Sequence, residues 1–414
     1  MYIFQTEKLD NGLEIIAEVN EDAYSMSLGF FVRTGSRDES EEIAGVSHFL
    51  EHMLFKGTNR RSAEDVNREL DEMGGNSNAF TSEEMTVYYA SFLPELQSRA
   101  VDLLSDFMRP ALRKKDFETE KSVILEEISM YFDQPPYAMD EKSRELFFKN
   151  HPLERSVLGT IQSIGDLSVE QMRAYFERQY SPGNMTVVAC GCVDFDLLVK
   201  EIQEKCGHWQ PFAIQRETFR PQSQRGFHLE VRETTTQEYV FQLTDGPSVA
   251  DPDRYAVALL ANIIGDDVGS RLFWELVDNG KADSATLSSC EFLDTGMLFT
   301  ALCCMPDDVE QNMKLMRHIL NDVEKNGVTE EELSRAKNKI LSRIVLASER
   351  PRGRLFSVGS EWTQTKKYSP IENDMKIVRE LTLDDVNATL KTYPLSNPLT
   401  VAVGPLKELN DCSF

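Results

Sequence analysis

Two histidines and a glutamate stand close together in the run His48-Phe-Leu-Glu51-His52. On a helix, residues four apart lie one turn apart, so both imidazoles would project from the same side. Two such imidazoles can chelate one zinc ion, and a catalytic zinc takes three protein ligands and keeps one position for water. His-x-x-Glu-His is also an inverted zinc-peptidase motif. The run therefore predicts a catalytic zinc site with a third ligand elsewhere, whereas a surface helix that carries these residues by chance is the alternative.

The third ligand is expected in the helix-like stretch 118–131, which ends shortly before Pro135-Pro136. Glu120 and Glu127 share one face of that helix and are separated by about 10 Å along its axis. Only one of them can therefore touch the same metal. Glu126 is the rival of Glu127 and would project about 100° away from this face.

A helix at residues 41–56 must carry the two histidines. Its apolar residues recur with the 3.6-residue period of a helix and form a stripe that would face the core. At about 100° per residue, His48, Glu51 and His52 point to roughly the opposite side. The stripe consists of Ile43, Val46, Phe49, Leu50, Met53 and Leu54.

Further strands and helices follow in a mixed pattern. The alternation of apolar residues predicts a strand at 26–33, and β-branched and aromatic residues predict another at 86–92. Between them, Ser62 is typical of a helix N-cap, and the helix that it opens would end at Gly74-Gly75. Another helix is expected to begin at Pro94.

Periodicity fades at residues 211–226, where prolines, glutamines and arginines gather as in an interdomain linker. With 414 residues, the chain is longer than one domain core usually grows. We therefore expect a zinc-binding catalytic domain at residues 1–210 and a second domain without a metal site at residues 227–414.

The order of elements recurs in the second domain, with a strand at 239–243, a Gly-Pro turn and helices at 253–265 and 270–277. The chemistry does not recur, because Leu260-Ala-Asn-Ile-Ile264 offers no metal ligands where the first domain has its histidines. The predicted fold class is α+β, with two homologous α/β domains, each a mostly antiparallel sheet packed with helices.

Composition limits the possible partners. A net charge of −25 argues against nucleic acid as the main partner, whereas it permits a cationic substrate or simply keeps the protein in solution. No apolar run approaches the roughly 18 residues that a membrane helix needs, and the first residues lead us to expect no secretory signal. Seven scattered cysteines suit reduced thiols and a cytoplasmic location. They are Cys190, Cys192, Cys206, Cys290, Cys303, Cys304 and Cys412.

Three segments resemble the pitrilysin family of metallopeptidases, peptidase family M16, in the short two-domain form of the mitochondrial processing peptidase subunits. They are 48–58, 74–81 and 120–128, and the resemblance extends over nearly the whole chain. That family places its third ligand about 75 residues beyond the second histidine. In this chain, 74 residues lie between His52 and Glu127. The resemblance implies a zinc site of His48, His52 and Glu127, with Glu51 as general base and Glu120 as a second acidic residue that supports catalysis.

The resemblance also implies substrate contacts. An extended peptide would lie on the edge strand after Gly74-Gly75, at Asn78 and Ala79, although these residues could equally belong to an ordinary hairpin. Arg271 matches an arginine that reaches the substrate in the family. The family's usual tyrosine is absent, because Asp283 stands in its place. A structural ion pair is the alternative for Arg271.

The function that these features predict is a Zn²⁺-dependent endopeptidase that hydrolyses extended, unfolded peptides with a metal-activated water. Large family members enclose their substrate with four such domains, so a second chain is expected, by default in a homodimer and otherwise in a heterodimer with a related chain. The alternative function is a non-catalytic or half-active peptide-binding subunit of a heteromeric assembly.

Overall fold

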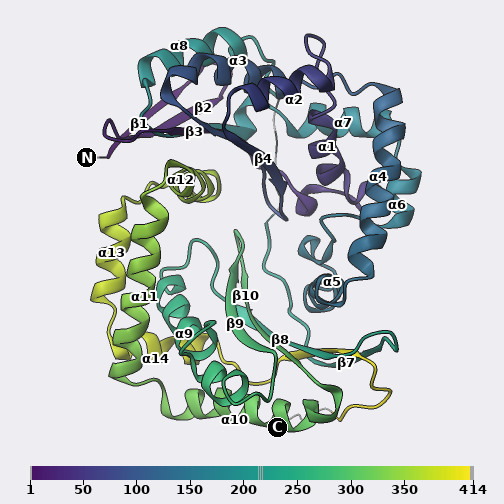
Figure 1. Cartoon of the computed structure of the whole chain (residues 1–414), viewed down its shortest axis with the longest axis vertical. Helices are drawn as coiled ribbons and strands as arrows, with labels where there is room; N and C mark the ends of the chain where they lie inside the picture. The colour runs from purple at the N-terminus through teal and green to yellow at the C-terminus, as the bar shows by residue number, and fades with distance from the viewer. Residues whose placement is uncertain (1, 213, 215, 217, 411–414) are drawn as a thin grey trace. The chain divides into compact units, whose positions relative to one another are not determined.

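The computed structural model describes residues 2–212, 214, 216 and 218–410; Cys412 and three positions of the expected linker lie outside them. The chain packs as two compact units (Figure 1). Unit 1 comprises residues 1–130, 155–217 and 346–369, and unit 2 comprises residues 131–154, 218–345 and 370–414.

Unit 1 contains a six-stranded sheet in the order β1-β2-β6-β3-β5-β4. Only the β2–β6 pair is parallel among these neighbours. The strands are β1 (Ile3–Lys8), β2 (Glu14–Val19), β3 (Met26–Val32), β4 (Asn76–Thr81), β5 (Thr86–Phe92) and β6 (Met185–Gly191). The helices are α1 (Val46–Leu54), α2 (Ala63–Glu72), α3 (Gln97–Phe107), α4 (Lys114–Phe132, in unit 1 through Met130), α6 (Ile161–Asp166), α7 (Val169–Gln179), α8 (Phe195–Cys206) and α12 (Pro351–Thr365).

Both faces of the unit 1 sheet are covered. Ile15 and Ala17 of β2 enter the main core, to which α1, α3, α7 and α8 contribute, whereas Ile16 enters a smaller core on the other face. α12 supplies Leu355 and Val358 to that smaller core and lies along β3 and β6 (Figure 1). Burial on both faces explains why the central strands are apolar at nearly every position.

α12 is fixed to the sheet by a buried ion pair. The guanidinium of Arg354, from the basic run that also holds Arg350 and Arg352, donates to Glu18 of β2 at 2.7 Å, and both side chains are almost fully buried. The hydroxyl of Tyr368 donates to the same carboxylate at 2.8 Å. Breaking a buried pair of this kind leaves an uncompensated charge, which costs about 3–5 kcal/mol.

Unit 2 repeats the topology of unit 1 without a counterpart of β1. Its sheet has the order β7-β11-β8-β10-β9, and only β7–β11 is parallel among these neighbours, as β2–β6 is in unit 1. The strands are β7 (Gly226–Val231), β8 (Glu238–Gly246), β9 (Ser284–Glu291), β10 (Gly296–Cys304) and β11 (Leu399–Gly404). The helices are α5 (Pro135–Phe147), α9 (Arg254–Gly265), α10 (Val309–Asn326), α11 (Glu330–Ser348, in unit 2 through Val345), α13 (Ile371–Glu380) and α14 (Leu383–Thr392).

The prediction of two homologous, mostly antiparallel α/β domains is thereby confirmed. The linear division at residues 211–226 did not anticipate one feature. α5 precedes that division in sequence but packs on β8 and β11, and α12 follows it but packs on β3 and β6. Each sheet thus takes the helix that covers its second face from the other half of the chain.

Most local predictions agree with the structure. β5 has the expected bounds, and Ser62 is the N-cap residue of α2, where its hydroxyl accepts from the Asp65 N–H in a capping box. The single helix expected at 41–56 is wrong, because a 3₁₀ turn at Glu41–Ile43 is separated from α1 by Gly45, which has φ 88°. Within the expected helix 270–277, Phe273–Val277 is a π-helix. Across the described residues, no helix is long and apolar enough to span a membrane.

Candidate metal centre

His48, His52 and Glu127 come together in unit 1. The histidines lie on α1 with ring centroids 4.7 Å apart, and Glu127 lies on α4. The His48 Nε2 is 3.9 Å from Glu127 Oε1, and the His52 Nε2 is 3.7 Å from Glu127 Oε2. Their three donor atoms lie within 4.8 Å of one another, and the described residues contain no other such group. Glu126, the rival of Glu127, is exposed and is not part of the group.

The three donor atoms fit a zinc ion. Their separations are too long for hydrogen bonds, so they face a shared gap instead of bonding to one another. Ligands at about 2.0–2.1 Å from a tetrahedral zinc are about 3.3 Å apart, slightly closer than the separations here. Two imidazoles and one carboxylate are also the donor set of a catalytic zinc with one open position.

The two histidine rings differ in the hydrogen bonding of their second nitrogen, Nδ1. His52 is oriented by Glu120, whose Oε1 lies 2.9 Å from the His52 Nδ1, so a proton on Nδ1 leaves the Nε2 lone pair toward Glu127. The Nδ1 of His48 is buried and has no hydrogen-bond partner among the described residues. Burial and then the neighbouring His52 lower the pKa of His48 to about 3, so its imidazole is neutral, as a metal ligand must be.

Glu120 lies behind His52 and is 4% exposed. Its second oxygen is 2.5 Å from the ammonium of Lys56. Burial acts to raise the pKa of Glu120, but the bonds from His52 and Lys56 outweigh it and hold the pKa below its usual value. Burial likewise acts to lower the pKa of His52, but Glu120 and Glu127 raise it. Lys56, Glu120 and His52 therefore form a charged chain that ends at the gap.

Glu51 shares the polar side of α1 and is 9% exposed. Its Oε2 accepts a hydrogen bond of 2.5 Å from the hydroxyl of Thr81, the last residue of β4. Burial raises the pKa of Glu51, while the Thr81 bond and the His52 charge oppose that rise. A carboxylate with a raised pKa is suited to accepting and returning a proton near neutral pH.

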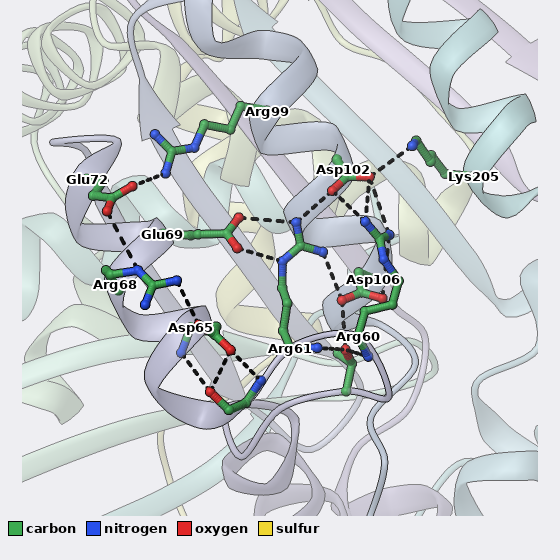
Figure 2. Close-up of polar contacts among 12 residues, drawn as sticks. Arg60, Arg61, Asp65, Arg68, Glu69, Glu72, Arg99, Asp102, Asp106 and Lys205 are labelled. Carbon is green, nitrogen blue, oxygen red and sulfur yellow. Dashed lines mark hydrogen bonds and ion pairs between the residues drawn. The ribbon is translucent and has the colours of Figure 1, made fainter.

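The segment that follows α1 is fixed by a network of charges (Figure 2). The Arg61 guanidinium donates to Glu69 of α2 at 2.9 Å, and to Asp102 and Asp106 of α3 at 2.6 and 2.9 Å. Figure 2 shows Lys205 of α8 reaching the same Asp102. α2 leads directly into β4, so the network connects the segment after α1 to the helix that precedes the edge strand.

Comparisons with known proteins identify relatives of this chain. The family model described as Insulinase (Peptidase family M16) matches residues 14–161, and the model described as Peptidase M16 inactive domain matches residues 166–340. An uncharacterized zinc protease of Mycobacterium bovis is 33% identical over 390 residues, which cover 92% of this chain and 89% of that protein. This chain belongs to peptidase family M16. YmxG of Bacillus subtilis, also named an uncharacterized zinc protease, is 29% identical over 382 residues, covering 91% of this M16 chain and 92% of YmxG.

Solved structures share the fold of this M16 chain. A protease from Helicobacter pylori has a TM-score of 0.91 at 19% identity, with 97% of this chain and 100% of that chain covered. A putative M16-like peptidase from Alicyclobacillus acidocaldarius has a TM-score of 0.84 at 22% identity, with 97% and 98% covered. At these identities the likeness supports the fold, and the site rests on the side chains above.

The expected substrate residues of the M16 chain lie in two places. Asn78 and Ala79 are on β4, which ends the unit 1 sheet and pairs with β5. Asn78 is exposed, and its Oδ1 accepts from the Ala79 N–H at 2.9 Å. Arg271 is in unit 2, where its guanidinium donates to Glu332 at 2.7 Å and to Asp322 at 2.9 Å. Asp283 accepts from the Gln237 side chain at 2.6 Å.

Lys56 and Thr81 were missed by sequence reasoning. Lys56 follows His52 by four residues, so helical spacing already placed it on the same side of the chain. Thr81 closes the Gly74–Thr81 segment, but its contact with Glu51 depends on how β4 packs against α1. No local pattern signals a contact of that kind.

Proposed function

We propose that this M16 chain is a zinc-dependent endopeptidase that hydrolyses extended, unfolded peptides. The observation that carries the proposal is the convergence of His48, His52 and Glu127 on one gap, with Glu51 on the same side of the same helix. Zinc held there would polarise the scissile carbonyl and acidify a water molecule.

The side chains of unit 1 would carry the proton transfers. Glu51 takes a proton from the attacking water and returns it to the leaving amine. The hydroxyl of Thr81 bonds to one oxygen of Glu51 and leaves the other oxygen to accept the proton. Glu120 holds the ring of His52 and, through it, the position of the Nε2 donor atom.

β4 would position the peptide. An edge strand has one unpaired side, to which an extended chain can add as a further strand. Asn78 and Ala79 lie on this strand, and Thr81 of the same strand touches Glu51. A peptide that follows β4 therefore passes the proposed base. Such binding reads backbone atoms more than side chains, so we expect a loose sequence preference and resistance of folded proteins.

A non-catalytic peptide-binding subunit is the second candidate. Its support comes from unit 2, because Arg271 is engaged by Glu332 and Asp322, and the family's tyrosine is replaced by Asp283. In this case a related second chain would provide the catalysis. A homodimer in which each chain carries its own centre remains our first proposal.

Metal analysis beside peptide cleavage, with and without a chelator, tests the function. We expect about one zinc per chain, cleavage that the chelator abolishes, and loss of both in His52→Ala. His318→Ala is the matched control, since His318 is an exposed histidine of α10; it should keep zinc and activity. Zinc binding without cleavage would support the subunit role, and full zinc occupancy in His52→Ala would refute the site.

A further inference from the structure

Glu39 is a buried carboxylate at the start of the metal-binding helix. It is 4% exposed. One oxygen accepts from the Gly45 N–H and the other from the Ser47 N–H, both at 2.7 Å. Gly45 is the N-cap residue of α1 and Ser47 is its second residue. A side chain from outside the helix therefore binds the backbone N–H groups that a helix start leaves unpaired.

α1 cannot provide this cap itself. Gly45 has no side chain, and no side-chain hydrogen bond from the N-cap residue is present. Replacement of Gly45 is prevented by its φ of 88° and by the Leu158 carbonyl oxygen, which would lie 2.4 Å from an added Cβ. The first turn of α1 also contains no acidic residue. Glu39 therefore supplies both the acceptors and the negative charge that favour a helix N-terminus.

The two metal-binding histidines differ in how they are held. The ring of His52 is oriented by Glu120, whereas the Nδ1 of His48 has no partner among the residues described. His48 is the third residue of α1, directly after Ser47. With no hydrogen bond to the second nitrogen of its ring, His48 depends on the backbone of the first turn for its position, and Glu39 fixes that turn.

A second anchor acts on the same turn. The Ser47 hydroxyl is 2.7 Å from the hydroxyl of Tyr175, which is 2.8 Å from the hydroxyl of Thr34. All three side chains are buried, or nearly so. Burial raises the pKa of Glu39 to about 7, and the N–H groups of Ser47 and Gly45 act against that rise. The backbone N–H groups that Glu39 caps therefore favour the ionised form of its carboxyl group.

Unit 2 provides an internal comparison. α9 occupies the position of α1 in the repeated topology, and its N-cap residue Asp253 makes no side-chain capping bond. Asp251 instead accepts from the Asp253 N–H at 2.9 Å, before the helix begins. Both units fold with this helix in place, so a buried carboxylate at its start is not a requirement of the topology. In the described part of the chain, the buried carboxylate is found only at the start of α1, the helix of these two that carries the histidines.

We propose that Glu39 is a positioning residue of the metal centre, which holds the first turn of α1 so that His48 presents its Nε2 to the ion. The proposal rests on the zinc site proposed above. Partners that orient metal ligands typically change metal affinity by about 10–100-fold when they are removed. Glu39 would act on the ligand through its backbone, without touching the ion.

The test is a zinc affinity measurement by competition with a chromophoric chelator, at a temperature where every variant is folded. Glu39→Gln replaces one acceptor oxygen by an NH₂ group facing a backbone N–H, and we expect zinc to bind about 10–100-fold more weakly. Glu39→Asp is the milder variant, because its shorter side chain reaches only one N–H; we expect an intermediate loss. It also serves if Glu39→Gln does not fold.

Glu18→Gln is the matched control. It neutralises another buried carboxylate of unit 1, the partner of Arg354 on the far side of the sheet from the main core. We expect Glu18→Gln to lower the melting temperature and leave zinc affinity unchanged. Wild-type affinity in the folded Glu39 variants, or an equal loss in Glu18→Gln, would overturn the positioning role. Absence of zinc from the wild-type chain would instead refute the proposed function.

Discussion

The two units of this chain share one topology and differ in the helix that follows the corresponding strands β3 and β8. In unit 1 this helix is α1, which buries eight of its nine residues, His48 and Glu51 included. In unit 2 it is α9, which buries nine of its twelve residues, all of them apolar or small except Asn262. Both helices are thus core helices. A few polar side chains on a buried helix, and not a different fold, distinguish the candidate metal centre.

The support around the two helices differs as well. α1 is held by Glu39 at its start and by Glu120 behind His52, two carboxylates that lie outside the helix. Buried polar groups need such partners, because an unpaired one is costly. In α9 the one buried polar residue is Asn262, and the N-cap residue Asp253 makes no side-chain capping bond. The comparison teaches that the centre consists of its three candidate ligands together with the acidic side chains that hold them.

The largest expected effect separates the candidate base from the candidate ligands. Glu51→Gln keeps the shape of the side chain and the Thr81 contact but cannot take a proton. We expect zinc to be retained and cleavage to fall by about a hundredfold or more. Steady-state cleavage beside metal analysis checks both results. Near wild-type cleavage would place the base on another residue.

The next effect concerns Glu120 and Glu127, which lie on the same helix. Glu127→Ala should lose zinc. Glu120→Ala should still bind zinc when zinc is in excess, with the cleavage rate lowered by about 10–100-fold because His52 is no longer oriented. Measuring the zinc content and the cleavage rate of both variants shows which glutamate is the third ligand. If Glu120→Ala loses zinc and Glu127→Ala keeps it, the third ligand has been assigned to the wrong glutamate.

A smaller effect is expected at the contact between the edge strand and the base. Thr81→Val replaces the hydroxyl by a methyl group of nearly equal volume and so removes the hydrogen bond to Glu51. A hydrogen bond to a charged group contributes enough for its loss to lower kcat about tenfold. Zinc content and KM should stay near those of the wild type. Thr81→Ser retains the hydroxyl and should restore most of the rate. A loss in Thr81→Ser as large as that in Thr81→Val would show that the hydroxyl bond to Glu51 does not by itself account for the effect.

Parts of the site that depend on local spacing could be predicted from the sequence. His48 and His52 share a side of α1 because helical periodicity fixes residues four apart, and Ser62 caps α2 as its type indicates. Glu127 could be chosen over Glu126 only through the family resemblance, since the periodicity of α4 alone left both open. The expected start of the helix at 41 failed because Gly45 adopts a left-handed conformation there.

Contacts that depend on how the chain turns or packs could not be predicted. Glu39 precedes the motif closely, yet its role depends on the chain turning back at Gly45 so that its carboxylate meets the start of α1. The packing of α12 on β3 and β6 joins segments more than 150 residues apart in sequence. Apolar periodicity shows that a helix has a buried face but does not identify the sheet that covers it.

The smallest expected effect on catalysis concerns Arg271, and it tests how far the likeness between the units extends. In unit 1, Arg61 follows α1 and binds three carboxylates; in unit 2, Arg271 follows α9 and binds Glu332 and Asp322. If both arginines hold the segment after the core helix, each alanine variant should lower the free energy of unfolding by about 1–3 kcal/mol, because charge-assisted hydrogen bonds are lost. KM for a peptide should then stay near that of the wild type in Arg271→Ala.

Denaturant unfolding beside steady-state kinetics distinguishes the structural role of Arg271 from a role in substrate binding, with Arg61→Ala as the matched control. A raised KM in Arg271→Ala, with KM unchanged in Arg61→Ala at a similar loss of stability, would instead assign Arg271 to the substrate, and the ion pairs with Glu332 and Asp322 would have to open when the peptide binds.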